Sequence, residues 1–152
     1  MNNKNPLLEF FNFGKKQPVK LSYMKVTLLC SKNLVRFLET SLFNINKFKN
    51  DDEDLWIDNW YEYNEDMIPK FQKKLEIDLL SIGFPNKLLS TVEYDIYYMF
   101  RDHLKYNCYG TIKPTINNIR KDIIKYNNKP YEIWDKSKLK AACKVHNVEL
   151  VD

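Results

Sequence analysis

Glycine is scarce in this chain, at only three of 152 residues. Loops that cradle phosphate groups need several closely spaced glycines, because the backbone itself must approach the phosphates. Arginine is also scarce, with 3 residues against 21 lysines. Since bidentate recognition of guanine favours arginine, the chain is poorly equipped to read a base sequence. These two shortages disfavour nucleotide-driven chemistry and sequence-specific base recognition.

Long apolar runs and paired cysteines are missing as well. No stretch of 18 apolar residues exists, so we expect no membrane span, and the N-terminus lacks the pattern of a secretory signal. Cys30, Cys108 and Cys143 are odd in number and far apart, so a disulfide framework is not expected. We therefore expect a reducing, intracellular location, either cytoplasmic or, in a eukaryotic host, nuclear.

The abundant residues point to the type of genome rather than to chemistry. Lysine, asparagine, isoleucine and tyrosine are frequent, whereas alanine occurs only at positions 141 and 142. This bias is typical of an AT-rich genome, such as that of a virus, a mobile element, a parasite or a low-GC bacterium. At 152 residues and 44% hydrophobic content, the chain is long enough for one domain with a sizeable core.

The net charge of +4 hides three blocks of alternating sign. Residues 1–49 carry a charge of +7, residues 50–102 carry −8, and residues 103–152 carry +5. Such a layout has two interpretations: the blocks neutralise one another inside the protein, or the basic ends form surfaces that meet a polyanion.

Apolar residues at helical spacing predict a mainly α fold, a single compact domain over 1–152 of about six helices and at most one short strand pair. Residues 19–30 are predicted to be strand or irregular, and 148–152 a short strand or a tail. The predicted helices cover 32–46 after a Ser31 cap, 53–64, 69–82 beginning at Pro69, 86–107, 114–126, and 138–146 after a Ser137 cap. Residues 5–13 are predicted to form a short helix, which either packs on the domain as its first helix or belongs to an N-terminal arm over 1–18 that docks on another subunit.

An acidic and aromatic stretch over 51–66 stands out in this otherwise basic chain. Trp56, Trp60 and Tyr63 share one face of the predicted 53–64 helix. The favoured interpretation is that this face packs into the core while the acids face solvent. The alternative is a docking helix for a partner protein, with contacts from Trp56, Trp60, Tyr63, Asp58 and Glu62.

The basic C-terminal part, 111–152, is the leading candidate for function. It is predicted as a loose helix-turn-helix-like unit, because the connection from Tyr126 to Ser137 is too long for a strict motif. Lys136, Lys140 and Lys144 lie on one face of the last helix, and Leu139, Cys143 and His146 lie on another. A basic ridge backed by an apolar face is typical of a helix that docks on nucleic acid. The candidate nucleic-acid contacts are Arg120, Lys121, Lys136, Lys140 and Lys144, although a solvated lysine face is the simpler alternative.

No catalytic or metal site is predicted. Cys143 and His146 have a spacing that two zinc ligands can use, but no second paired motif accompanies them. His103 lies near the end of a predicted helix without a recognisable nucleophile motif. Carboxylates over 58–66 could hold a hard cation, yet the calcium-loop signature is absent. We therefore expect no cofactor.

The sequence favours a non-enzymatic binding or regulatory module that contacts nucleic acid or a nucleoprotein complex through its basic C-terminal helices. A protein-interaction factor, such as an inhibitor or assembly subunit that uses the 51–66 helix, is the second hypothesis. A small metal-dependent hydrolase is the third and weakest.

Overall fold

The computed structural model describes residues 17–108 and 111–152, and within them it contains six helices and two short strands. The helices are α2 (Tyr23–Phe48), α3 (Glu53–Ser81), α4 (Asn86–Thr91), α5 (Glu93–Asn107), α6 (Ile112–Asn128) and α7 (Lys136–Val145), and the strands are β1 (Val19–Ser22) and β2 (Val148–Val151). The predicted mainly α fold with one strand pair is therefore confirmed. The predicted N-terminal arm lies outside the described residues except for positions 17 and 18.

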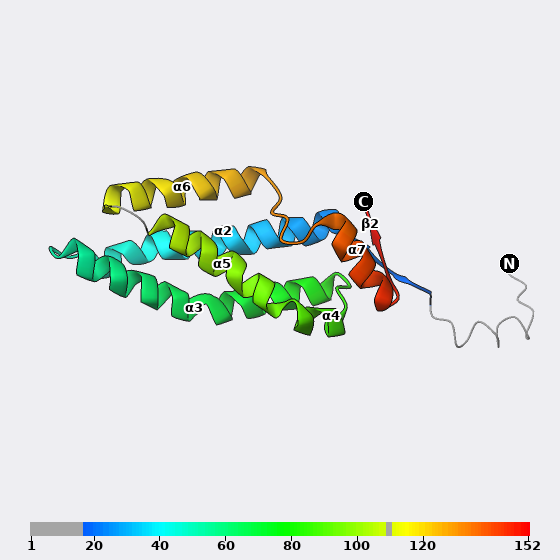
Figure 1. Cartoon of the computed structure of the whole chain (residues 1–152). Helices are drawn as coiled ribbons and strands as arrows, with labels where there is room; N and C mark the ends of the chain where they lie inside the picture. Colours follow the sequence, from blue (N-terminus) through cyan, green and yellow to red (C-terminus); the bar gives the residue numbers. More distant parts are fainter. Residues whose placement is uncertain (1–16, 109–110) are drawn as a thin grey trace, which may run out of the picture.

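The longer helices run along one axis of an elongated molecule (Figure 1). Helix α2 packs against both α3 and α6, and α5 packs against α3, α6 and α2. Helix α7 and the strand pair form one end of the molecule, where the C-terminus lies (Figure 1). None of the helices in the described ranges has the length and apolarity that crossing a membrane requires.

The first strand is shorter than predicted, and the helix after it starts earlier. Strand β1 ends at Ser22, whose side chain caps α2 by accepting a hydrogen bond from the Lys25 N–H at 3.2 Å. The predicted cap, Ser31, is instead buried inside α2 and donates its hydroxyl to the Leu28 carbonyl. The prediction was wrong here because buried Val26 and Cys30 already follow helical spacing.

Helix α3 is one continuous helix of 29 residues, whereas two helices were predicted. Asp52 caps it by accepting a hydrogen bond from the Leu55 N–H at 3.2 Å. Pro69 lies inside the helix and is exposed. A proline inside a helix costs stability, but burial of Ile68 and Leu75 on either side holds this segment helical.

The predicted 86–107 helix is divided in two at Val92. The backbone there departs from helical geometry, with φ −110° and ψ 9°. Thr91 and Val92 are adjacent β-branched residues with low helix propensity, and the Thr91 hydroxyl donates to the Leu88 carbonyl. Local side-chain chemistry therefore ends α4 after six residues, and α5 starts in a new direction (Figure 1).

The two C-terminal helices begin slightly before their predicted starts. Helix α6 starts at Ile112, so Pro114 falls in its first turn. Helix α7 starts at Lys136, and its cap is Asp135 rather than Ser137. The Asp135 carboxylate accepts hydrogen bonds from the N–H groups of Ser137 and Lys138, at 2.9 and 3.3 Å. Asn147 follows this helix with a positive φ of 56°.

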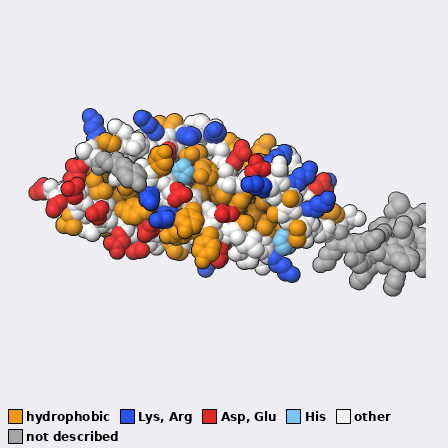
Figure 2. All heavy atoms as spheres, viewed as in Figure 1, with side chains coloured by type: hydrophobic (Ala, Val, Ile, Leu, Met, Phe, Trp, Pro, Cys, Tyr) orange, Lys and Arg blue, Asp and Glu red, His pale blue; other side chains and the backbone are white. Residues whose placement is uncertain are grey.

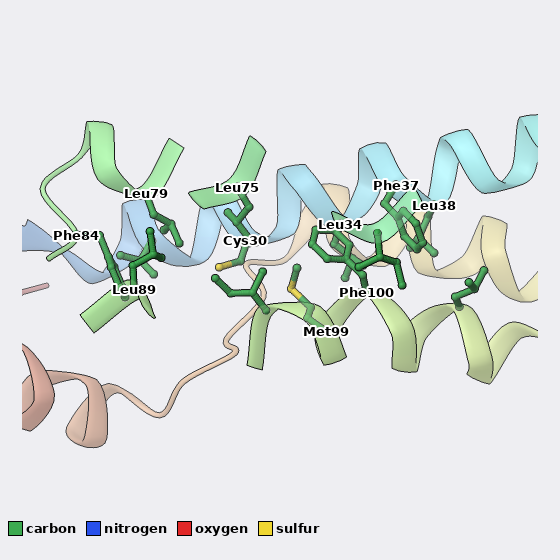
Figure 3. Packing of buried hydrophobic residues seen from close by; sticks show 14 of the residues in the cluster. Cys30, Leu34, Phe37, Leu38, Leu75, Leu79, Phe84, Leu89, Met99 and Phe100 are labelled. Carbon is green, nitrogen blue, oxygen red and sulfur yellow. The ribbon is translucent and has the colours of Figure 1, made fainter. Parts of the chain in front are cut away.

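The core lies between α2, α3 and α5. Figure 3 shows Leu34, Phe37 and Leu38 of α2 close to Met99 and Phe100 of α5. The Phe37 ring packs edge-on against Phe100, with ring centres 5.2 Å apart. Ile96, Met99, Phe100 and Leu104 of α5 are all buried, so that helix is a central element of the core.

The two strands are parallel and join distant parts of the chain. Val19 pairs with Val148 and Leu21 with Leu150, so the whole helical body lies between the strands in sequence. Leu21 and Leu150 both belong to the core. The Asp152 carboxylate accepts hydrogen bonds from the Met24 N–H and the Ser22 hydroxyl, which ties the end of β2 to the start of α2.

Candidate functional site

Trp56 and Trp60 point into the core. Their exposed fractions are 2% and 0%, and the Trp60 indole N–H donates to the Ser41 carbonyl at 2.8 Å. The packed interpretation of the 51–66 stretch is thus confirmed for these two side chains. In this fold neither tryptophan is accessible to a partner protein.

The polar residues of the same stretch have separate roles. Asp58 and Glu62 are exposed, in line with the expected solvated face. Tyr63 is half-buried, and its hydroxyl lies 3.1 Å from the Lys47 ammonium of α2. Glu53 accepts a hydrogen bond from the Ile112 N–H at 2.8 Å, so it caps the start of α6 across a distance of 59 residues in sequence. Sequence reasoning missed that contact, because no local pattern connects the two positions.

The five candidate nucleic-acid contacts are all exposed. Arg120 and Lys121 lie on α6, whose opposite side buries Thr115 and Ile119. Lys136, Lys140 and Lys144 lie on α7, and the buried Leu139 and Cys143 lie on the neighbouring face of that helix. The predicted separation of lysines from apolar residues is therefore present on the last helix, and α6 also has a basic side and an apolar side.

Helices α6 and α7 are not packed on each other as a helix-turn-helix pair. Helix α6 lies along α2 and α5, whereas α7 packs against β2. The connecting residues 129–135 pack onto the body of the protein: the Trp134 indole N–H donates to Asp95 at 3.0 Å, and its ring lies 5.5 Å from that of Phe84. The basic residues consequently form a long edge rather than one compact ridge.

The surface has opposite charges at different edges. Figure 2 shows Lys and Arg side chains over α6 and onward toward α7, and Asp and Glu side chains gathered where α3 begins. In the parts of the chain that the structure describes, the ion pairs are Lys74–Asp78, Arg101–Glu65 and His103–Asp122, the last only when the histidine is protonated. None of them includes the five basic candidates. Direct pairing between the charge blocks therefore does not neutralise this basic edge.

Among the five basic candidates, Lys136 interacts with an aromatic ring and with a carboxylate. Its ammonium lies 5.8 Å from the centre of the Tyr23 ring. It also contributes to the lowered pKa of Asp152, after the larger effects of hydrogen bonds from the Met24 N–H and the Ser22 hydroxyl. Lys140 and Lys144 border a hollow of about 330 Å³ together with Pro18 and Val148.

Burial disfavours the reactive thiolate form of all three cysteines, of which Cys30 and Cys143 are buried and Cys108 is half-buried. Burial raises the pKa of Cys108 to about 12, and it also raises the pKa values of the Cys30 and Cys143 thiols. A thiolate is the form that attacks electrophiles and binds zinc, and the raised pKa values disfavour that form. Over residues 17–108 and 111–152, no three side chains of His, Cys, Asp or Glu are placed to hold a metal ion, and Cys143 and His146 are not joined by a third ligand.

His103 lies in an aromatic and acidic hollow between α5 and α6. Its Nδ1 is 3.7 Å from the Asp122 carboxylate, and its ring packs edge-on against Tyr126 and Tyr131. Burial raises the pKa of Tyr131 to about 12, so that phenol stays protonated at neutral pH. The side chains that border this hollow include no serine, threonine or cysteine to act as a nucleophile. The arrangement serves best as a contact that fixes α6 to α5.

Comparisons of the chain with protein-family models, with curated proteins and with solved structures found no match. The function of the candidate surfaces therefore has to be inferred from their geometry and charge.

Proposed function

We propose that the protein is a non-enzymatic binding module that contacts nucleic acid, or a nucleoprotein complex, through the basic edge formed by α6 and α7. The observation that supports this proposal best is the state of the five basic residues. All five are exposed, and none takes part in an ion pair within the described residues. Unpaired cations along one edge suit a polyanion, which releases its own counterions when lysines replace them.

The chemistry favours contacts to the phosphate backbone. Four of the five residues are lysines, which act as point charges toward phosphates, while bidentate guanine contacts favour arginine. On α6 the outward residues Lys113, Lys121 and Lys125 have no exposed acid among them, since Asp122 is half-buried. We therefore propose binding with little sequence preference.

The test is a fluorescence-anisotropy titration of the whole chain with labelled duplex and single-stranded oligonucleotides. The variant K136E/K140E/K144E removes the α7 part of the edge, and we expect it to abolish binding at roughly 50 mM salt, where phosphate contacts are strong. For duplex DNA, the slope of log K against log salt measured at lower salt should shrink by about 3, one unit for each lysine that no longer neutralises a phosphate.

A matched control makes the same change of charge elsewhere. Lys70, Lys73 and Lys87 are exposed lysines on α3 and α4 and are not part of the basic edge. The variant K70E/K73E/K87E should keep most of the affinity. Absence of wild-type binding at low salt, or an equal loss in both triple variants, would refute the proposed function.

A further inference from the structure

Helices α2 and α6 leave an apolar groove between them. The groove has a volume of about 550 Å³, and Leu42, Phe43, Ile116 and Ile124 are among the side chains that line it. Phe43 is 74% exposed and Ile124 is 64% exposed. Large apolar side chains gathered around one hollow are costly to leave in water and are typical of interaction sites. Within the described residues, no segment of the chain covers this groove.

The surroundings of this groove are basic on balance. Its own rim carries one acid and one base, Glu39 of α2 and Arg120 of α6, and the neighbouring hollow along α2, which shares Glu39, adds Lys32 and Arg36. None of these three basic residues forms an ion pair within the described residues. A fitting occupant would therefore present an apolar side chain with acidic neighbours.

The chain carries such a surface on the first turns of α3. Leu55 is 54% exposed, on a different face of the helix from the buried Trp56 and Trp60. Asp54 and Asp58 flank it, and both are exposed. Neither carboxylate forms an ion pair in the described part of the chain.

Both surfaces lie at the same end of the molecule. Glu53 at the start of α3 bonds to Ile112 at the start of α6, and this end is opposite to α7 (Figure 1). A two-fold axis at this end can place each acidic surface in the groove of the other copy. Each copy contributes one groove and one α3 surface, so this reciprocal contact covers both grooves and both α3 surfaces.

We propose that the α2–α6 groove binds the Leu55 surface of a second copy of this chain, which produces a symmetric dimer. Charge complementarity and the apolar match both select this occupant. The proposal goes beyond nucleic-acid binding and does not depend on it. Arg120 belongs to both surfaces, whereas the lysines of α7 lie outside the groove.

The test is analytical ultracentrifugation over a range of protein concentrations. We expect the mass to rise toward twice the monomer mass of 18.3 kDa and to fall as salt is added, since exposed charges contribute. Phe43→Glu and Leu55→Lys should each weaken dimerisation at least tenfold, with unchanged circular dichroism because both side chains are exposed. Tyr94→Glu, at a 70% exposed position on α5, should dimerise like the wild type.

Charge exchange provides the most specific result. The variant R36E/R120E makes the surroundings of the groove acidic and keeps the acidic α3 surface, whereas D54K/D58K keeps the basic surroundings of the groove and makes the α3 surface basic. Each should be monomeric alone, and an equimolar mixture should form a heterodimer, because both contacts are then matched. A monomeric wild type, or dimers that tolerate Phe43→Glu and Leu55→Lys, would overturn the proposal. K136E/K140E/K144E should dimerise normally, so failure of this proposal and failure of nucleic-acid binding are distinguishable.

Discussion

Trp60 combines complete burial with a satisfied polar group. Its indole N–H donates to the Ser41 carbonyl of α2, while its own carbonyl accepts from the Asn64 amide at 2.6 Å. Asn64 in turn accepts a hydrogen bond from Asn44 of α2 at 2.9 Å. Buried polar groups are tolerated when they are paired in this way, and the pairing fixes the alignment of α2 with α3.

We expect Trp60→Ala to lower the free energy of unfolding by about 3–5 kcal/mol, because it leaves a large cavity and an altered polar network. Urea denaturation followed by circular dichroism measures this change. Tyr94→Ala, at an exposed position, should change stability by no more than about 0.5 kcal/mol. A mild Trp60→Ala variant would mean that this side chain is not part of the core.

At the scale of helices, Asp78 connects α3 to α2. Its carboxylate accepts hydrogen bonds from Lys74 of the same helix and from the Asn33 amide of α2. Burial alone would raise the pKa of Asp78, but the hydrogen bonds from Lys74 and Asn33, together with the positive charges of Lys74 and Lys32, outweigh it, so the pKa is lowered. The ionised form is therefore stabilised by folding.

The sign of the pH effect follows from that lowered pKa. The contribution is present above the unfolded pKa of about 3.9 and is lost as the pH falls through the folded value. We expect Asp78→Asn to cost about 1 kcal/mol at pH 7 and nothing at a pH where Asp78 is protonated in both states. Chemical denaturation at several pH values tests this, with the exposed Asp66→Asn as control. A gap that stays constant with pH would contradict it.

At the scale of the whole molecule, the strand pair and α7 close one end of the helical body. Val148 and Leu150 of β2 are buried against the same core as the helices. This placement makes the closing end part of the domain's folding unit rather than an appendage.

Leu150→Ala should therefore lower the global free energy of unfolding by about 2–5 kcal/mol. In hydrogen exchange measured by mass spectrometry, amides of α2 and α3 should lose protection together with those of β2. Glu149→Ala, on the exposed side of the same strand, should have little effect. If only α7 and the strands lose protection, this end unfolds independently.

Much of the fold was predictable because apolar spacing is a local signal. Buried Ile96, Met99 and Phe100 follow the helical period, and the buried tryptophans do so as well. The errors arose where local signals conflict with packing. Pro69 resembles a helix start, but the neighbouring buried face overrides it. Ser31 resembles a cap, yet it lies within a helix that Ser22 already starts.

The candidate surfaces were predictable only in part. Exposure of Lys136 and Lys140 follows from helix periodicity. The absence of ion pairs between the charge blocks in the described residues could not be predicted, because the sequence gives the charges but not the distances between them. The α2–α6 groove was missed for a similar reason: Phe43 and Ile124 are 81 positions apart, and only the packing of α6 on α2 brings them to one hollow.

The parallel strand pair also constrains the order of folding. Val19 and Val148 are 129 positions apart, so pairing them in an unfolded chain would cost about 4 kcal/mol of loop-closure entropy. Pairing of two four-residue strands is too weak to offset that cost by itself. The helices must assemble first and bring the strand positions close together. Closure of the sheet is then a late folding event, after the transition state for the helical body, and substitutions in it should speed unfolding more than they slow folding.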